Sequence, residues 1–140
     1  MEFLIENIKL VDWTTLSANG SDGALDLLEA HPNNIDWSQL CLSRLSPRAI
    51  ALLLANPVKI NWNALSRNDS DEALDLLEAN IHEICWPALI KFNKSPRAET
   101  LLFSKPGEID WQAVSNSPQP WAKLLTSKRK RAVELCKSVL

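Results

Sequence analysis

The sequence predicts an all-α protein, and more specifically an α-solenoid of stacked helix-turn-helix units that ends in one long helix. Its 140 residues include only three glycines and no tyrosine, while runs rich in Ala, Leu and Glu favour helix over sheet. Five of the six tryptophans recur in steps of 24, 25, 24 and 25 residues: Trp13, Trp37, Trp62, Trp86 and Trp111. A repeat of this length is typical of solenoids, because one unit cannot bury its apolar face alone.

The alternating steps make the true period 49 residues. The segment at 21–30 reads "SDGALDLLEA" and matches "SDEALDLLEA" at 70–79. The segment at 46–57 reads "SPRAIALLLANP" and matches "SPRAETLLFSKP" at 95–106. Two types of unit therefore alternate along the chain.

Each unit is expected to open with a short helix that carries the tryptophan in its first turn. A good N-cap residue precedes four of the five tryptophans: Asp12, Asp36, Asn61 and Asp110. Cys85 takes this place before Trp86 and is the weak cap. Pro87 fits the first turn of that helix, where a missing N–H costs nothing.

A longer helix follows in each unit and is expected to begin at a serine. These N-cap serines are Ser21, Ser46, Ser70 and Ser95. Pro47 and Pro96 fit the first helical position. The helices should end near Pro32, Pro57 and Pro106, since proline disfavours the α conformation of the residue before it. Their leucines recur on one face, so neighbouring units should stack with Trp and Leu inside.

We expect a single helical-repeat domain over residues 1–140. Residues 1–11 form a partial unit, because "FLIEN" at 3–7 occupies the place of "LLEAH" in the next unit. Either Met1 starts a short natural cap or the chain is a piece of a longer array, and we favour the cap. Residues 12–117 form the repeats, and 118–140 form the capping segment, with one long helix expected from about Trp121 to Val139.

The segments "NPVKINWNALSRN" and "HEICWPALIKFN" resemble the tryptophan-containing helical repeats of large DNA viruses and of some algae and protists. That family has the form N-P-x-x-I-x-W-x-x-L-S-x-N followed by A-x-x-L-L, and the resemblance covers about residues 3–125. This chain departs from it in having Ser-Pro or Ser-Asp and longer spacers where many members keep Asn-Pro. The resemblance implies the solenoid and a viral or algal source, but no activity.

The composition indicates a soluble intracellular protein, cytoplasmic or nuclear, in a host cell if the source is viral. No secretory leader is apparent, and the longest apolar run, 49–55, is too short to span a membrane. The three cysteines are odd in number and far apart, so we expect reduced, buried thiols rather than disulfides: Cys41, Cys85 and Cys136.

Nothing in the sequence indicates an enzyme, a metal site or a cofactor. His31 and His82 are the only histidines, and neither belongs to a recognisable nucleophile signature. The spacing of His82 and Cys85 is metal-like, but no second pair completes a tetrahedral zinc site. The three glycines are scattered and form no phosphate-binding loop.

Charge is divided unevenly along the chain. Residues 1–120 carry 9 basic and 16 acidic side chains, whereas the last twenty carry 6 basic and 1 acidic. An acidic body repels a nucleic-acid backbone, so we do not expect nucleic acid as the main partner. One basic cluster, Lys128, Arg129, Lys130 and Arg131, is either the solvated face of the capping helix or a contact for an acidic partner or for nuclear import.

The expected function is a non-enzymatic scaffold for protein interaction or structural assembly, in which the partner is another protein or a second copy. The alternative is an RNA- or DNA-associated repeat protein that uses the basic end. Aligning the long helices places Glu29 and Glu78 level with Leu54 and Phe103. Either the alternate units tilt and bury Leu54 and Phe103, or these side chains are exposed and anchor a partner, with the two glutamates as a polar rim.

Overall fold

The computed structural model describes residues 10–139, and all regular structure in that part of the chain is helical. The five short tryptophan helices are α2 (Trp13–Ser17), α4 (Trp37–Leu42), α6 (Trp62–Arg67), α8 (Trp86–Phe92) and α10 (Trp111–Asn116). The longer helices are α3 (Asp22–Ala30), α5 (Pro47–Ala55), α7 (Asp71–Ala79) and α9 (Arg97–Ser104). Helix α11 (Pro120–Val139) ends the described chain. The predicted α-solenoid is confirmed.

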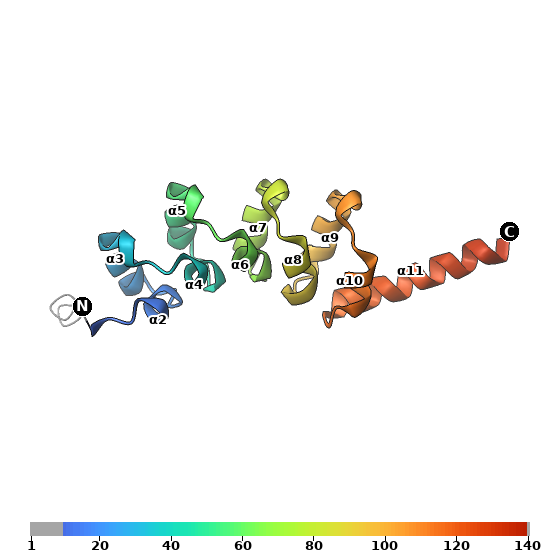
Figure 1. Ribbon diagram of the computed structural model, residues 1–140, viewed down its shortest axis with the longest axis horizontal. Coiled ribbons are helices and arrows are strands. Elements are labelled where there is room, and N and C mark those ends of the chain that lie inside the picture. Colours follow the sequence, from blue (N-terminus) through green and yellow to red (C-terminus); the bar gives the residue numbers. More distant parts are fainter. Residues whose placement is uncertain (1–9, 140) are drawn as a thin grey trace.

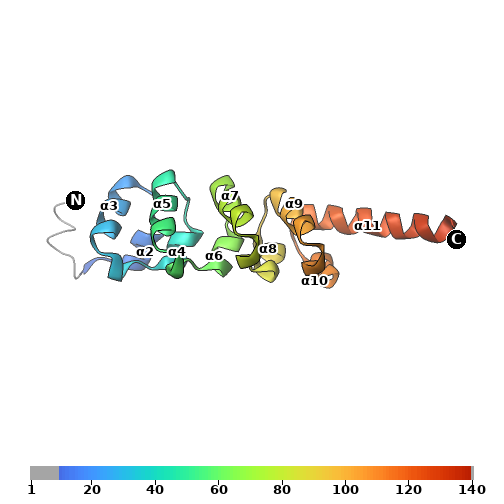
Figure 2. The same cartoon turned by 90° about the horizontal axis from the view of Figure 1, so that it is seen from above.

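The short helices form one row and the longer helices a second row beside it (Figure 1). Figure 2 shows the same two rows from above, with successive units side by side along the long axis of the molecule. Contacts between successive short helices run through the whole first row. The short helices therefore form the continuous row of contacts that runs the length of the stack.

The predicted caps of the short helices are present. Their side-chain oxygens accept the backbone N–H three residues on, at 3.0 to 3.2 Å: Asp12, Asp36, Asn61 and Asp110. Cys85 accepts no such bond, as expected of a weak cap.

Serine caps three of the longer helices in the predicted way. The Oγ atoms of Ser21, Ser46 and Ser70 each accept the N–H of the alanine three residues on, at 3.2 Å. The fourth helix differs, because α9 begins at Arg97 and Pro96 is its N-cap. Ser95 Oγ instead accepts the Arg97 N–H at 3.2 Å. This cap still satisfies one backbone donor that the helix cannot.

A short 3₁₀ helix follows each of the four longer helices, a feature that the sequence pattern did not predict. These are η2 (Pro32–Asn34), η3 (Pro57–Lys59), η4 (Ile81–Glu83) and η5 (Pro106–Glu108). Proline opens three of them, since a proline at the first helical position loses no hydrogen bond. The prolines that end α3, α5 and α9 thus also start the next turn of chain.

Leucine, rather than tryptophan, fills the centre of the stack. The largest fully buried side chains are nearly all leucines, among them Leu28, Leu53, Leu77 and Leu102 of the longer helices. The five repeat tryptophans are half-buried and pack against the edge of this core. They are therefore part of the structure without forming its centre.

Two buried asparagines, Asn68 and Asn93, tie their units to the preceding ones. Asn93 is fully buried, and its Nδ2 donates to the carbonyls of Ser66 at 3.0 Å and Asn68 at 3.1 Å. Its Oδ1 accepts the Ser95 N–H at 3.0 Å. Asn68 makes the same pattern of bonds one unit earlier. These bonds hold the linkers at the unit junctions in register.

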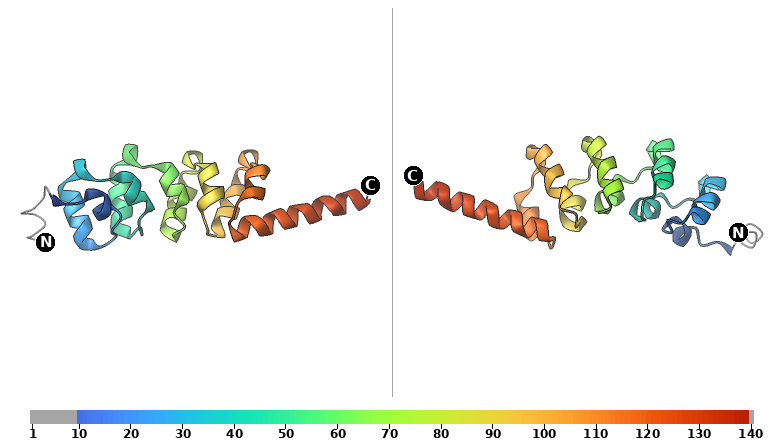
Figure 3. Two further views of the ribbon diagram at one scale, coloured as in Figure 1. Left: turned by 60° about the horizontal axis from the view of Figure 1, so that its bottom comes forward. Right: turned by 180° about the vertical axis from the view of Figure 1, so that it is seen from behind.

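Helix α11 caps the stack only with its first turns. Trp121, Ala122 and Leu125 are buried, and the Trp121 Nε1 donates to the Asn93 carbonyl at 2.7 Å. The rest of the helix continues away from the stack along the long axis of the molecule, as all views show (Figures 1, 2 and 3). The apolar side chains in that part of the helix, such as Val133 and Leu135, are exposed.

The structure corrects the prediction that all three cysteine thiols are buried. All three thiols are unpaired, but only Cys41 is buried, and burial raises its pKa. Cys85 is half-buried, and Cys136 is exposed because it lies on the projecting part of α11.

Candidate functional site

An arginine from α5 clamps α5 to the preceding long helix, α3. The Arg48 Nε donates to Glu29 Oε1 at 3.1 Å, and its Nη2 bonds both Glu29 Oε2, at 3.0 Å, and Asp26. The Nη1 donates to the Asp22 carbonyl at 3.2 Å. These bonds raise the pKa of Arg48 and lower that of Glu29. We call this set of contacts the first arginine clamp.

The same arrangement recurs 49 residues later between α9 and α7. The Arg97 Nη2 donates to Asp75 at 2.8 Å and to Glu78 at 3.1 Å. Its Nη1 donates to the Asp71 carbonyl at 3.2 Å and lies 3.5 Å from that residue's carboxylate. This second arginine clamp joins α7 to α9. The 49-residue period therefore pairs the long helices, α3 with α5 and α7 with α9.

No clamp forms between the two pairs, where α5 faces α7. Glu72 occupies the position in α7 that Arg48 occupies in α5. Ala51 and Leu54 occupy the positions in α5 that carry carboxylates in α3. Among the described residues, Glu72 forms no salt bridge. The partners that an arginine clamp requires are absent on both sides of this interface.

A groove with a volume of about 480 Å³ lies at this unclamped interface. Helix α5 lines it with Pro47, Ile50 and Leu54, and helix α7 and its C-cap line it with Glu72, Asp75, Leu76, Ala79 and Asn80. Most of this surface is apolar. The two carboxylates lie toward the start of α7, and Ala79 lies at its end. We call this feature the α5–α7 groove.

Leu54 is the predicted site residue that lines the groove. Its side chain is 55% exposed, so of the two alternatives for this residue the structure shows the exposed one. Phe103 is also exposed, at 48%, but it lies on α9 and is not part of the groove. The structure therefore does not bring these two residues into one site.

Glu29 and Glu78, the two glutamates of the hypothesis, take part in the arginine clamps. Their carboxylates are bound within the arginine clamps by Arg48 and Arg97, and Glu78 also lines a smaller cavity of about 130 Å³ between α7 and α9. The acidic residues that line the groove are Glu72, which forms no salt bridge among the described residues, and Asp75, which the second clamp also binds; the helix alignment identified neither.

The basic cluster of residues 128–131 lies on the projecting part of α11 and is exposed. Arg129 stacks on Trp111, with its guanidinium carbon 4.4 Å from the ring centroid. This cation–π contact directs one of the four basic side chains toward the stack. The remaining three lie in solvent.

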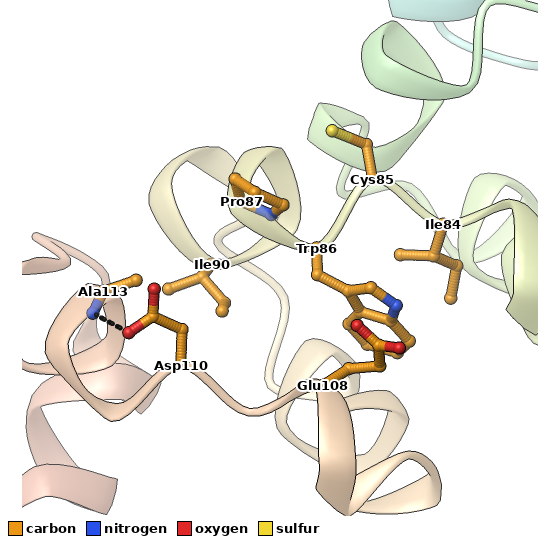
Figure 4. A pocket seen from close by; sticks show the side chains of 8 residues that line it. All are labelled: Ile84, Cys85, Trp86, Pro87, Ile90, Glu108, Asp110 and Ala113. Carbon is orange, nitrogen blue, oxygen red and sulfur yellow. Dashed lines mark hydrogen bonds between the residues drawn. The ribbon is translucent and has the colours of Figure 1, made fainter.

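A second cavity, of about 350 Å³, lies between α8 and α10 (Figure 4). Carboxylates of Glu108 and Asp110 and the thiol of Cys85 are among its lining groups. Asp110 Oδ1 accepts the Ala113 N–H at 3.2 Å, so this carboxylate acts as a helix cap. The Cys85 Sγ accepts from Asn63 at 3.3 Å, and the thiol points away from both carboxylates (Figure 4). The cavity therefore does not pair a nucleophile with a base.

The histidines lie apart from both cavities. His31 packs against Trp13 with the ring centroids 5.5 Å apart, and His82 lies 3.9 Å from Glu83. Over residues 10–139, no group of three or more His, Cys, Asp or Glu side chains is arranged to hold a metal ion. Within the same range, no helix has the length and apolar character that crossing a membrane requires.

Comparison of the chain with protein-family models, with curated proteins and with solved structures found no match.

Proposed function

We propose that this chain is a non-enzymatic helical-repeat scaffold that binds a protein partner in the α5–α7 groove. The observation that carries the proposal is the alternation of the interfaces. Arginine clamps join the long helices on either side of the groove, whereas the interface between the pairs has apolar residues and a glutamate that no described cation pairs with. The groove thus lies between two helix pairs, each of which is joined by its own arginine clamp.

The groove's chemistry favours a partner segment with an apolar anchor and basic neighbours. Leu54 is exposed, Ile50 is half-buried, and the buried Leu76 also lines the groove, so these three provide apolar contact; an exposed apolar side chain in such a groove marks an interaction surface. Glu72, which no described cation pairs with, favours Lys or Arg beside the anchor, whereas the Asp75 carboxylate already binds Arg97. An amphipathic helix laid between α5 and α7 satisfies both requirements.

The acidic charge of residues 1–120 also favours a partner segment with basic residues. Residues 1–120 carry seven more acidic than basic side chains, 16 against 9. Such a field attracts basic segments and raises their rate of association at low salt.

The motif residues also lead us to propose a relationship to the tryptophan-containing repeats of large DNA viruses and algae.

A peptide selection tests the proposal even while the natural partner is unidentified. Random displayed peptides are selected on the immobilised chain, and the binders are measured against three variants. Leu54→Ser removes the anchor's contact, and Phe103→Ser is the matched control at the equivalent position outside the groove. The triple variant Glu72→Arg, Ala51→Asp, Leu54→Glu installs an arginine clamp at the open interface.

The proposal predicts peptides rich in Leu, Lys and Arg that bind Phe103→Ser normally and lose binding to the other two variants. Peptides that bind the clamped variant as well as the original chain would show that the groove is not the site. Retention of the chain on a polyanion that is abolished by changing the basic residues of α11, with no peptide bound at the groove, would favour the nucleic-acid alternative.

A further inference from the structure

One side of α11, running from its first turns into its projecting part, matches the groove in chemistry. Leu124, Lys128, Arg131 and Leu135 are spaced by four, three and four residues, so they share one side of the helix. All four are exposed, and Leu124 and Leu135 are 56% and 62% exposed. This face combines apolar anchors with basic neighbours, which is the chemistry that the groove requires.

The residue spacing on this side of α11 also matches the spacing of the groove residues on α7. On α7, Glu72 and Asp75 are three residues apart, and Ala79 follows four residues later beside Leu54 at the end of the groove. On α11, Lys128 and Arg131 are three residues apart, and Leu135 follows four residues later. A parallel alignment places Lys128 beside Glu72, Arg131 level with Asp75, which Arg97 already binds, and Leu135 level with Ala79 at the apolar end. An antiparallel alignment of the same residues places Arg131 level with Leu76 and Lys128 level with Ala79 instead.

These two surfaces cannot meet within one copy in this structure, because α11 extends away from the stack at the far end from α5 (Figures 1 and 3). We propose that the projecting half of α11 of one copy docks in the α5–α7 groove of a second copy. This inference rests on the proposed function, since it names the occupant of the same groove.

The charges of the two halves support pairing between copies. The last twenty residues carry 6 basic and 1 acidic side chain, against the acidic excess of residues 1–120. Pairing α11 with α11 instead brings two basic clusters together, which repel. Because the docking surfaces differ, each copy offers one of each, and association continues head to tail unless the rotation closes a ring.

Sedimentation velocity on the full chain tests the inference, at about 50 mM and about 500 mM NaCl, over which charge screening differs strongly. The expected result is a series of species that grows with concentration and shrinks with salt. Leu135→Ser, Glu72→Lys and Lys128→Glu should each weaken association by about tenfold, through a lost apolar contact or a like-charge pair. The double variant Glu72→Lys, Lys128→Glu reverses both charges and should restore association.

Three results would overturn the inference. One is a monomer at low salt up to about 500 µM protein, a concentration at which even weak association is populated. Another is association that Glu72→Lys leaves unchanged, and a third is failure of the double charge reversal to restore it. If selected peptides still bind the groove of a monomeric chain, the proposed function stands and only the identity of the occupant is wrong.

Discussion

Replacing Asn93 by alanine should lower the free energy of unfolding by about 3–5 kcal/mol. The side chain is fully buried and makes three hydrogen bonds, two to carbonyls of the preceding unit and one from the Ser95 N–H. Each bond contributes about 1 kcal/mol net, and a buried group left without its partner costs about 1–3 kcal/mol. The alanine removes all three bonds and supplies none.

Asn19→Ala is the matched control, because Asn19 takes the equivalent position in an earlier unit but is exposed. Its side chain makes one hydrogen bond, from the Ser21 N–H at 3.0 Å. The expected loss is about 1 kcal/mol or less. Asn93→Ser should fall between the two, since Ser117 at the next equivalent position donates to the Ile90 carbonyl.

Urea unfolding at constant temperature, followed by tryptophan fluorescence and circular dichroism, provides the three values on one scale. The order should be Asn93→Ala, then Asn93→Ser, then Asn19→Ala, from most to least destabilised. If Asn93→Ala loses no more stability than Asn19→Ala, the buried asparagines do not hold the unit junctions together.

Three further predictions concern stability. Trp62→Ala should cost about 3 kcal/mol, the lower end of the range for a large aromatic, because Trp62 is only half-buried against the core; unchanged urea stability would contradict its structural role. Ser46→Ala should cost about 1 kcal/mol through loss of a helix cap, and Ser95→Ala about 1 kcal/mol through loss of its bond from the Arg97 N–H, both with an unchanged circular dichroism spectrum; no measurable loss at either site would refute these contributions. Hydrogen bonding to Arg48 lowers the pKa of Glu29 below its ordinary 4.5, so the stability that this pair contributes is present above that pH and is lost as the pH falls through the lowered pKa. Thermal unfolding from roughly pH 6 to pH 3 should therefore show a smaller acid-induced loss in Arg48→Gln; an identical pH profile in this variant would contradict the pairing.

The repeat and its helices could be predicted because the signals are local. A tryptophan after Asp36 or Asn61, and an alanine three residues after Ser46, each mark a helix start by hydrogen bonds that form within one turn. Three of the 3₁₀ helices were missed because proline signals both the end of one helix and the first position of the next, and the fourth begins at Ile81 without a proline. The local sequence around such a proline does not show whether it ends one helix or begins another.

The groove could be predicted only in part. Alignment of the long helices identified Leu54, because a leucine stands where other units carry glutamate. Its neighbours Glu72 and Asp75 were missed, because their role depends on which helix lies opposite. Aligning the sequence with itself at a shift of 24 or 25 residues would have shown the difference. At the interface between α5 and α7, the arginine position is taken by Glu72 and the two carboxylate positions by Ala51 and Leu54.

Helix α11 shows where the pattern gave the right element but not its surroundings. Its helical spacing predicted one long helix, and the structure has it at Pro120–Val139. The whole helix was expected to cap the stack, yet only Trp121, Ala122 and Leu125 of its first turns are buried. Periodicity fixes which residues share a face, but not whether anything lies against that face.

The site itself is tested most directly by nuclear magnetic resonance on the isotope-labelled chain, titrated with a selected peptide. We expect the amide signals of residues 47–54 and 72–80 to shift together and to saturate, because these segments line the groove. Signals of α3 and α10 should stay in place. Shifts centred on the α8–α10 cavity or on α11, with the signals of α5 and α7 unchanged, would contradict the assignment of the groove as the binding site.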